Sequence, residues 1–507
     1  MSRIQKLKKN IIYGYASSII SVILGFISRT VFIYILNESY LGVYSLFTNV
    51  LGVLSFADLG LGTAMNFALY KPVADDDKNT IKSLMLFYKK SYRKIAGVIT
   101  IIGIGIIPVL QFIVKDPGDV GNIYVYYLIF LFNTVSTYFV SYKFALVYAE
   151  QKNYVITRID MIVNTINLTI NIIVLLIFKN FLIYLLSSSI ILLFRAMFLS
   201  FYLNKEYPYL MEKDVLELSQ TQIAPIKKNV NALIFHKFAE VAIYQTDNII
   251  ISSFINVTTV GRIANYNILI TSVNTFIHMI FNSAISSFGD LVAEGDLIKN
   301  LKTFKIYNFI NFWIYGFSSI SFYLLLTPFI TLWIGDSSLI DGWSVFLICV
   351  SNYFLGQRTS FLNFKTAFGQ FYDDKYAALI AAIINLVVSV VMVNLIGLPG
   401  IYIGTLVSGL FESIVRPIIS YQKITDDNIS NYFKELISYA LVTGFTMLVT
   451  KYIIKLLIPN VTLLGFIGMC FIVLFSVNIQ FWLYYRSSKL FKESKFVLLN
   501  AIGGMKK

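Results

Sequence analysis

Runs of about 20 apolar residues recur along the whole chain, and each is long enough to cross the hydrocarbon core of a bilayer as a helix. Hydrophobic residues make up 57% of the 507 positions and charged residues only 13%, and the mean hydropathy is +0.72. A backbone in lipid must satisfy its own hydrogen bonds, so only helices or a closed barrel can span. Because the apolar runs are continuous and do not alternate, the sequence predicts an all-α integral membrane protein.

The sequence predicts about fourteen transmembrane helices, counted as apolar runs of spanning length. These predicted spans are 11–36, 41–68, 95–114, 123–148, 156–178, 181–203, 229–255, 262–288, 306–334, 343–367, 376–396, 400–421, 435–456 and 461–485. The first run is much longer than the core of a signal peptide, and no small-residue cleavage pattern follows it.

An internal repeat organises these spans into two lobes. At a shift of about 219 positions, Leu41-Gly42 aligns with Val260-Gly261 and Lys8-Lys9-Asn10 aligns with Lys227-Lys228-Asn229. Within one position of that shift, the repeat also aligns Pro108 and Asp116 with Pro328 and Asp336, and Ile166-Asn167-Leu168 with Ile384-Asn385-Leu386. We therefore expect an N-terminal six-helix lobe, a cytoplasmic linker, a C-terminal six-helix lobe, two additional helices and a basic cytoplasmic tail, at 1–203, 204–228, 229–421, 432–485 and 486–507 respectively.

The positive net charge of the chain reflects its predicted membrane topology. The formal net charge is +14, and most of the 41 Lys and Arg residues fall at the termini and in the loops on one side of the predicted spans. Basic loops face the cytoplasm, so both termini are expected there, in a bacterial-type cell membrane. Nucleic acid is not an expected partner, and the basic tail is expected to lie on the inner membrane surface. The connections on the opposite side are short, which leaves no room for an extracellular catalytic domain.

Charged residues inside the spans are the candidates for function, because each is costly in hydrocarbon unless it faces water or a partner. Arg29, Lys237 and Arg358 are the candidate substrate-binding residues, since cationic groups bind phosphate oxygens and arginine does so bidentately. The repeat aligns Arg29 with Asn248, next to Asp247. Arg29 and Asp247 then either meet where the two lobes close, or each pairs within its own lobe.

The remaining gate or coupling candidates are Asp58, His278 and Glu240. Asp58 aligns beside His278, and a carboxylate and an imidazole in a cavity can exchange protons near neutral pH. A hydrogen-bonded packing role is the alternative for this histidine. Glu240 lies three residues after Lys237, so these two charges can simply neutralise each other on one helix face.

Three further intramembrane charges bear on the candidate site. Glu412 and Arg416 are spaced as a structural i,i+4 pair. Arg358 and Arg195 have no obvious local partner, and Arg358 is the better cavity-lining candidate because Gln357 beside it adds polarity.

Several chemistries are excluded or disfavoured by what the sequence lacks. It contains no Gly-Lys dipeptide and hence no Walker-type phosphate-binding loop. Its two histidines and two cysteines have no metal-ligand spacing, so we expect neither a metal nor a cofactor. No catalytic set stands out, and the chain is not expected to be an enzyme.

Four short phrases, in this order and spacing, carry a resemblance to a known family. They are Leu41-Gly42-Val43-Tyr44, Phe56-Ala57-Asp58-Leu59-Gly60-Leu61-Gly62, Asp247-Asn248-Ile249-Ile250-Ile251-Ser252 and Val260-Gly261 with Tyr266. Over nearly its whole length the chain resembles the polysaccharide repeat-unit flippases of the multidrug/oligosaccharidyl-lipid/polysaccharide exporter superfamily. The second lobe departs mildly, with Gly261-Arg262-Ile263-Ala264-Asn265-Tyr266 where relatives often have a glycine-aromatic phrase.

The resemblance implies two six-helix lobes plus two helices, and alternating access that moves an undecaprenyl-diphosphate-linked oligosaccharide from the inner to the outer leaflet. The product would enter capsule, O-antigen or exopolysaccharide synthesis, with a polysaccharide polymerase and glycosyltransferases as partners. Three alternatives stay open: a lipid II flippase, a gradient-driven small-molecule antiporter of the same fold, and a membrane glycosyltransferase or polymerase.

Overall fold

The computed structural model describes residues 3–55, 61–212, 215–227, 230, 241–242, 245–293, 295–368, 374–425 and 427–504. Every regular element among these residues is a helix, and ten of the helices are long and apolar enough to cross a membrane. The predicted all-helical membrane fold is therefore confirmed.

Among the predicted spans that are not counted with these ten, the one at 343–367 falls short for a physical reason. The helix over Gly342–Ala367 is long enough to span, but it carries Asn352, Gln357, Arg358 and Lys365 on buried faces and is therefore too polar to count as a span. These polar side chains are buried against neighbouring helices. The predicted spans 41–68 and 229–255 include residues outside the described ranges.

The chain divides into two compact units, Met1–Ala264 and Asn265–Lys507. The division falls inside helix α12 (Val257–Ala293), whereas the repeat in the sequence places a linker at 204–228. The reason is that helix α11 (Thr246–Phe254) and the first turns of α12 pack against helices of the N-terminal lobe. The lobe boundary remains a prediction from the repeat.

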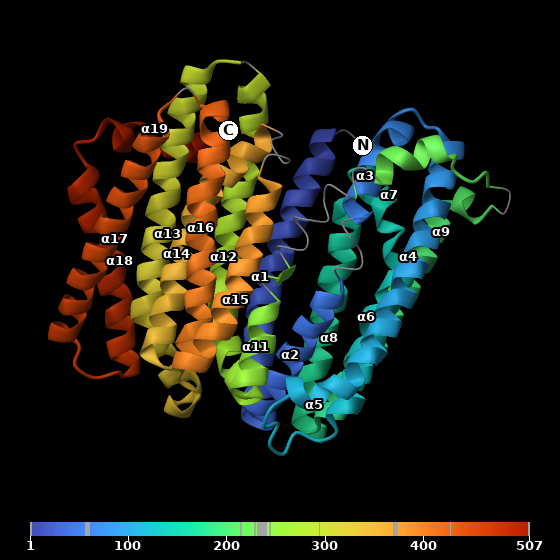
Figure 1. Cartoon of the computed structure of the whole chain (residues 1–507), viewed down its shortest axis with the longest axis horizontal. Coiled ribbons are helices and arrows are strands. Elements are labelled where there is room, and N and C mark those ends of the chain that lie inside the picture. Colours follow the sequence, from blue (N-terminus) through green and yellow to red (C-terminus); the bar gives the residue numbers. More distant parts are fainter. Residues whose placement is uncertain are drawn as a thin grey trace. The chain divides into compact units, whose positions relative to one another are not determined.

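In the first unit, α1 packs along α8, and α6 contacts both α4 and α9 (Figure 1). Its helices before α11 are α1 (Arg3–Leu36), α2 (Glu38–Leu54), α3 (Leu61–Ala74), α4 (Lys78–Ile106), η2 (Ile107–Val109), α5 (Leu110–Ile113), α6 (Ile123–Ser141), α7 (Phe144–Ala149), α8 (Asn153–Phe178), α9 (Phe181–Glu206) and η3 (Pro208–Met211).

In the second unit, α13 packs against α14, α17, α18 and α19, and α15 forms a tight hairpin with α16 (Figure 1). The helices that follow α12 are α13 (Leu297–Ile334), η4 (Asp336–Ser338), α14 (Gly342–Ala367), α15 (Lys375–Ile396), α16 (Leu398–Ile424), α17 (Ile429–Leu457), α18 (Leu463–Tyr485) and α19 (Lys489–Gly504).

Short polar side chains begin many of these helices. Asn37, in a left-handed conformation with φ 74°, is the only residue between α1 and α2, and its side chain accepts a hydrogen bond from Ser39 N. Asn180 caps α9 and Asp341 caps α14 in the same manner. Such caps satisfy amide groups that a helix leaves without an internal partner. The Asn37 cap lets α2 follow α1 after a single residue, so this connection is shorter than the predicted Asn37–Tyr40.

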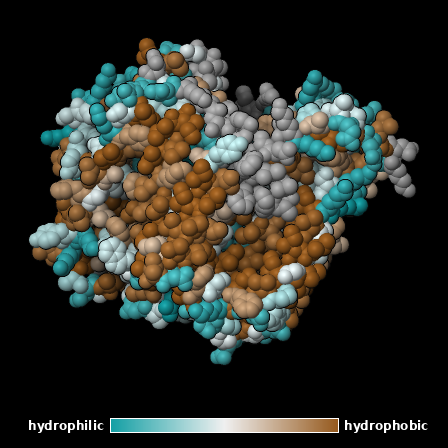
Figure 2. Space-filling model, in the orientation of Figure 1, coloured by the Kyte–Doolittle hydropathy of each residue, from teal (hydrophilic) through white to brown (hydrophobic). Residues whose placement is uncertain are grey.

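Large hydrophobic side chains are exposed along the outer faces of the spanning helices, among them Ile101, Leu395, Leu441 and Leu464. On the face drawn in Figure 2, hydrophobic residues cover the middle of the helices, and hydrophilic residues gather near their ends. A water-soluble protein rarely exposes apolar patches of this extent, so these surfaces face lipid.

Candidate functional site

Helices α2 and α12 cross at two glycines in the first unit, Gly42 and Gly261. A Cβ added to Gly42 would lie 1.9 Å from the carbonyl oxygen of Val257, and one added to Gly261 would lie 2.0 Å from that of Glu38. No side chain fits at such distances, so the backbones touch directly. These two glycines are the pair that the internal repeat aligns.

The contacts around the crossing have an approximate two-fold symmetry. Ser39 and Thr258 lie 219 positions apart, and their hydroxyl oxygens are 2.9 Å from each other. The same separation divides Gly42 from Gly261 and Glu38 from Val257, so each repeat presents to the other the same surface that it receives. The two repeats detected in the sequence therefore touch each other, through the equivalent first turns of α2 and α12.

Ion pairs and hydrogen bonds surround the crossing. Arg262 Nε donates to Glu38 Oε2 over 3.1 Å. The amide of Val257 donates to the carbonyl of Lys115, whose ammonium in turn donates to the carbonyl of Phe254. Together with the glycine contact, these bonds join α2, α11, α12 and the segment after α5.

A second polar contact lies further along the same helices. Asn49 on α2 donates to the Gln245 side chain over 2.6 Å and accepts from Asn248 on α11 over 2.7 Å. Asp247, a predicted gate residue, sits in the first turn of α11 between those two partners. No ion pair joins Asp247 to Arg29, although the structure describes both residues. The hypothesis that Arg29 and Asp247 meet where the two lobes close, directly or through water, therefore stays a prediction.

Arg29 lies inside α1 among aromatic rings. Tyr44 on α2 and Tyr184 on α9 are its electrostatic neighbours. The Tyr184 ring lies edge-on to Phe32, with centroids 5.3 Å apart, and Tyr44 lies 6.3 Å from Tyr184. The Nη1 atom of Arg29 is buried without a hydrogen-bond partner, and among the described residues no carboxylate pairs with this guanidinium. A cation with aromatic neighbours and no internal counter-ion can accept an anionic ligand.

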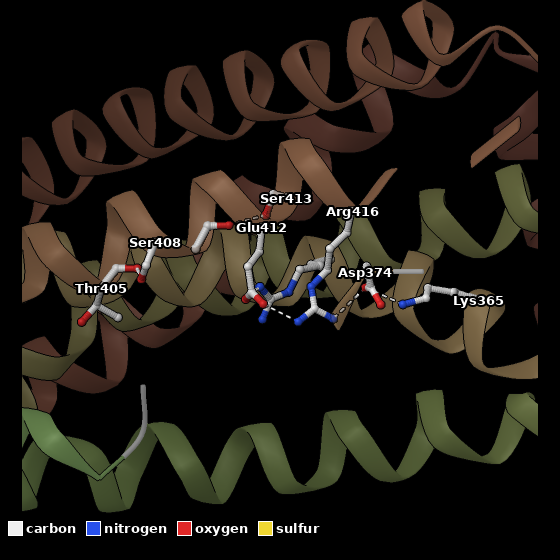
Figure 3. A network of polar contacts seen from close by, with 9 residues as sticks. Lys365, Asp374, Thr405, Ser408, Glu412, Ser413 and Arg416 are labelled. Carbon is white, nitrogen blue, oxygen red and sulfur yellow. Dashed lines mark hydrogen bonds and ion pairs between the residues drawn. The ribbon is translucent and has the colours of Figure 1, made fainter. Parts of the chain in front are cut away.

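In the second unit, five charged side chains form a row of alternating sign that we call the charge ladder (Figure 3). Its members are Arg358, Glu412, Arg416, Asp374 and Lys365 in contact order, and they come from α14, α16 and the turn before α15. Arg416 Nη1 lies 3.3 Å from Asp374 Oδ2, and the other three contacts are closer ion pairs. Asp374 is fully buried and Glu412 is 2% exposed. The ladder links α14, α16 and the turn before α15 by charge.

The ladder confirms one predicted pair and adds a partner for Arg358 that the sequence did not indicate. The i,i+4 pair of Glu412 and Arg416 is present, as the sequence indicates. Arg358, for which the sequence offers no local partner, pairs with Glu412 across 54 positions. Arg195 likewise has a partner, because its Nη2 lies 2.7 Å from Asp160 Oδ1 on α8. Both partners lie on neighbouring helices, and residue spacing along one helix cannot reveal such contacts.

The other predicted site residues divide into those described and those not. His278 on α12 is exposed, and the Tyr315 hydroxyl lies 3.5 Å from its Nδ1. That contact fits the alternative of a hydrogen-bonded packing histidine. Asp58, Lys237 and Glu240 lie outside the described residues.

Sequence reasoning missed a row of buried amides between α12, α13 and α14. Asn274 donates to Asn352, which donates to Ser319, and Asn311 donates to the carbonyls of Gly356 and Gln357. The signal was available, because asparagine in an apolar run must find partners inside the protein. These bonds hold α13 and α14 in register.

Solved structures of other proteins share the fold of this chain. Lipid II flippase MurJ in an inward closed conformation aligns with 94% of this chain and 99% of its own, with a TM-score of 0.64 at 14% sequence identity. An inward-facing multidrug resistance MATE family transporter of the MOP superfamily aligns with 80% of this chain and 96% of its own, with a TM-score of 0.60 at 14% identity. A MATE transporter of Vibrio cholerae gives a TM-score of 0.52 at 13% identity, covering 80% of this chain and 98% of its own.

The chain therefore has the fold of the membrane transporters and flippases of the MOP superfamily. No protein-family model and no curated protein matches the sequence. At these identities the likeness concerns the fold, and the cargo has to be argued from the residues.

Proposed function

We propose that this protein is a flippase that moves an undecaprenyl-diphosphate-linked oligosaccharide from the inner to the outer leaflet of a bacterial-type cell membrane. The observation that carries the proposal is the position of Arg29, inside a spanning helix, whose Nη1 atom is buried and whose guanidinium has no carboxylate partner among the described residues. A guanidinium binds diphosphate oxygens bidentately, and the neighbouring Tyr44 and Tyr184 offer faces for sugar rings.

The glycine crossing supplies one of the two closures that alternating access requires. It joins equivalent surfaces of the two repeats, and transporters built from repeats commonly rock one repeat against the other. In this proposal the crossing closes the outer side, both termini are cytoplasmic, and the crossing separates when cargo is released. Polysaccharide polymerase and glycosyltransferases are the proposed partners.

The C-terminal helices favour a lipid-linked cargo over a small soluble one. The MATE transporter matches 80% of this chain and the lipid II flippase matches 94%. Helices α17 and α18, which have no counterpart in the repeat, come after the six-helix C-terminal lobe. The broader match to a flippase fits a cargo whose lipid tail stays in the bilayer.

Lipid II is the second candidate cargo, favoured by the same structural match. It also carries a polyprenyl diphosphate, so Arg29 would contact the same group in either case. In this proposal Arg358 remains a predicted substrate contact, and its pairing with Glu412 gives it a structural role as well.

Proteoliposomes loaded with fluorescent lipid-linked oligosaccharide, or in parallel with lipid II, test the proposal by the fraction of label that reaches the opposite leaflet. Loss of charge-assisted bonds worth about 1.5–3 kcal/mol predicts that Arg29→Ala slows transfer by roughly 10–150-fold. Arg29→Lys keeps the positive charge but loses the bidentate guanidinium, and its transfer rate should lie between those of Arg29→Ala and the unmodified protein. Lys94→Gln on the exposed face of α4 is the matched control and should transfer normally.

Two results would contradict the proposal. If the labelled glycan grew longer, the protein would be forming glycosidic bonds and would belong to the polymerase alternative. If Arg29→Ala transferred at the rate of the unmodified protein, the guanidinium would not contact the cargo. Faster transfer of lipid II than of oligosaccharide would select the second candidate.

A further inference from the structure

A lateral hollow lies between α13, α14 and α17 of the second unit. Its volume is about 150 Å³, and its wall includes Ile320, Phe346, Cys349, Gly444 and Met447. Cavities of this size with apolar walls stay dry and take apolar molecules. α14 and α17 both pack against α13, so the hollow is a gap beside α13 in the membrane-spanning part of the unit.

The polar atoms of this wall are mostly engaged with the protein itself. The Ser319 hydroxyl accepts a hydrogen bond from Asn352 Nδ2 over 3.1 Å, and the Thr443 hydroxyl donates to the carbonyl of Tyr439 over 2.8 Å. A water molecule needs two to four polar partners to occupy a cavity stably. The wall therefore suits a hydrocarbon chain better than water or a polar ligand.

A cation stands at the edge of the hollow. Lys451 on α17 donates from Nζ to the hydroxyl of Tyr323, which lines the hollow, over 2.8 Å. The same ammonium lies 5.0 Å from the centre of the Tyr323 ring. Lys451 is exposed, and no carboxylate pairs with it in the described part of the chain. It lies about 9 Å from the end of α17 at 1.5 Å per residue, within reach of lipid headgroups for a long side chain.

We propose that this hollow binds one acyl chain of an anionic phospholipid whose phosphate lies against Lys451. The two features complement each other in the way a phospholipid requires, with an apolar slot for the chain and a cation at the headgroup end. The leaflet concerned is the one nearest the connection between α17 and α18. The inference does not depend on the transported cargo, since the site lies within the second unit and would be occupied by bulk lipid.

Photo-crosslinking in proteoliposomes tests the site. Phosphatidylglycerol and phosphatidylcholine, each with a diazirine in one acyl chain, are the probes, and modified peptides are mapped by mass spectrometry. In the unmodified protein we expect phosphatidylglycerol to label the segments around Cys349 and Gly444 about fivefold more than phosphatidylcholine, the preference that one lysine near a charged headgroup gives. Lys451→Gln should bring the ratio to about one, while Lys455→Gln on the same helix should leave it unchanged.

Filling the hollow provides an independent variant. A Cβ at Gly444 would meet nothing within 4 Å, so Gly444→Leu places its side chain in the hollow without a backbone clash. We expect Gly444→Leu to remove the crosslinks at Cys349. Gly444→Ala, with a smaller side chain, should reduce them in part. Gly97→Leu, which also projects into open space on α4, is the matched control and should leave them intact.

Three results would overturn the proposal. Crosslinks spread evenly over the lipid-facing helices and unchanged by Gly444→Leu would show that the hollow is not a site. Equal labelling by the two phospholipids in the unmodified protein would show that Lys451 does not select an anionic headgroup. Stronger labelling of the hollow by a diazirine-bearing polyprenyl diphosphate than by phosphatidylglycerol would show that it takes the tail of a prenyl lipid instead.

Discussion

The glycine crossing allows a quantitative prediction about conformational balance. In Gly42→Ala the new methyl group would lie 1.9 Å from the Val257 carbonyl oxygen, and such contacts do not occur below 3.0 Å. The two helices must therefore separate at this point or bend. Forcing an extra methyl into a packed contact costs about 1–3 kcal/mol. This cost falls only on the closed arrangement, so the population with the crossing formed should drop by roughly 5–150-fold.

Disulfide formation measures that population. Ser39→Cys combined with Thr258→Cys, in a background with Cys349 and Cys470 replaced by Ala, places two thiols where two hydroxyls are 2.9 Å apart. We expect rapid crosslinking in the otherwise unmodified protein and a rate roughly 5–150-fold lower after Gly42→Ala. Crosslinking should also stop cargo transfer until a reductant is added.

The symmetry of the contact makes the test stricter. Gly261→Ala would place its methyl 2.0 Å from the Glu38 carbonyl oxygen, so it should slow crosslinking to the same degree as Gly42→Ala. The double variant should slow it by less than the product of the two, because both methyl groups widen one gap. Gly97→Ala on α4 has open space around its Cβ and should have no effect on the crosslink.

Two outcomes would refute this reasoning. If Gly42→Ala crosslinks at the unmodified rate, the crossing is not a tight contact in the membrane. If only one of the two glycines responds, the two-fold symmetry of the contact does not hold.

Two further predictions concern stability. Glu412→Gln removes the buried carboxylate that pairs with both Arg358 and Arg416 and should destabilise the protein by about 3–5 kcal/mol, seen as a lower thermal midpoint of the purified protein. Glu493→Gln removes a partly exposed ion pair with Lys302 and should change stability by less than about 1 kcal/mol, so an equal shift in the two variants would contradict a structural role for the ladder. Asp341→Ala removes the side chain that caps α14 and should cost about 1 kcal/mol in the same assay, whereas an unchanged midpoint would mean that the cap is not formed.

The fold was predictable because long, continuous apolar runs can cross a membrane only as helices. The apolar runs at 156–178, 181–203 and 376–396 correspond closely to α8, α9 and α15. The boundaries near the crossing were less predictable. The sequence assigns Asn37–Tyr40 to a loop, but the single residue Asn37 turns the chain and α2 begins at Glu38. Capping chemistry, which apolar periodicity does not register, decides that boundary.

The candidate site was predictable only where the sequence itself contains a pattern, such as the internal repeat. The repeat aligned Gly42 with Gly261, and the structure brings these two residues together. The partners of Arg358 and Arg195 were not predictable, because Glu412 and Asp160 lie on other helices. Such contacts depend on how helices are rotated about their axes, and one sequence does not encode that in any simple periodicity.

The reciprocal glycine contact also constrains how the two halves of this chain can diverge. Each glycine makes room for a backbone oxygen of the opposite half. The close contact therefore requires a residue without a side chain in both halves. A bulkier residue on one side cannot be relieved by a smaller one on the other, since both positions already lack a side chain. At this point a duplicated chain must keep its two copies alike, however far the rest of the halves drift apart.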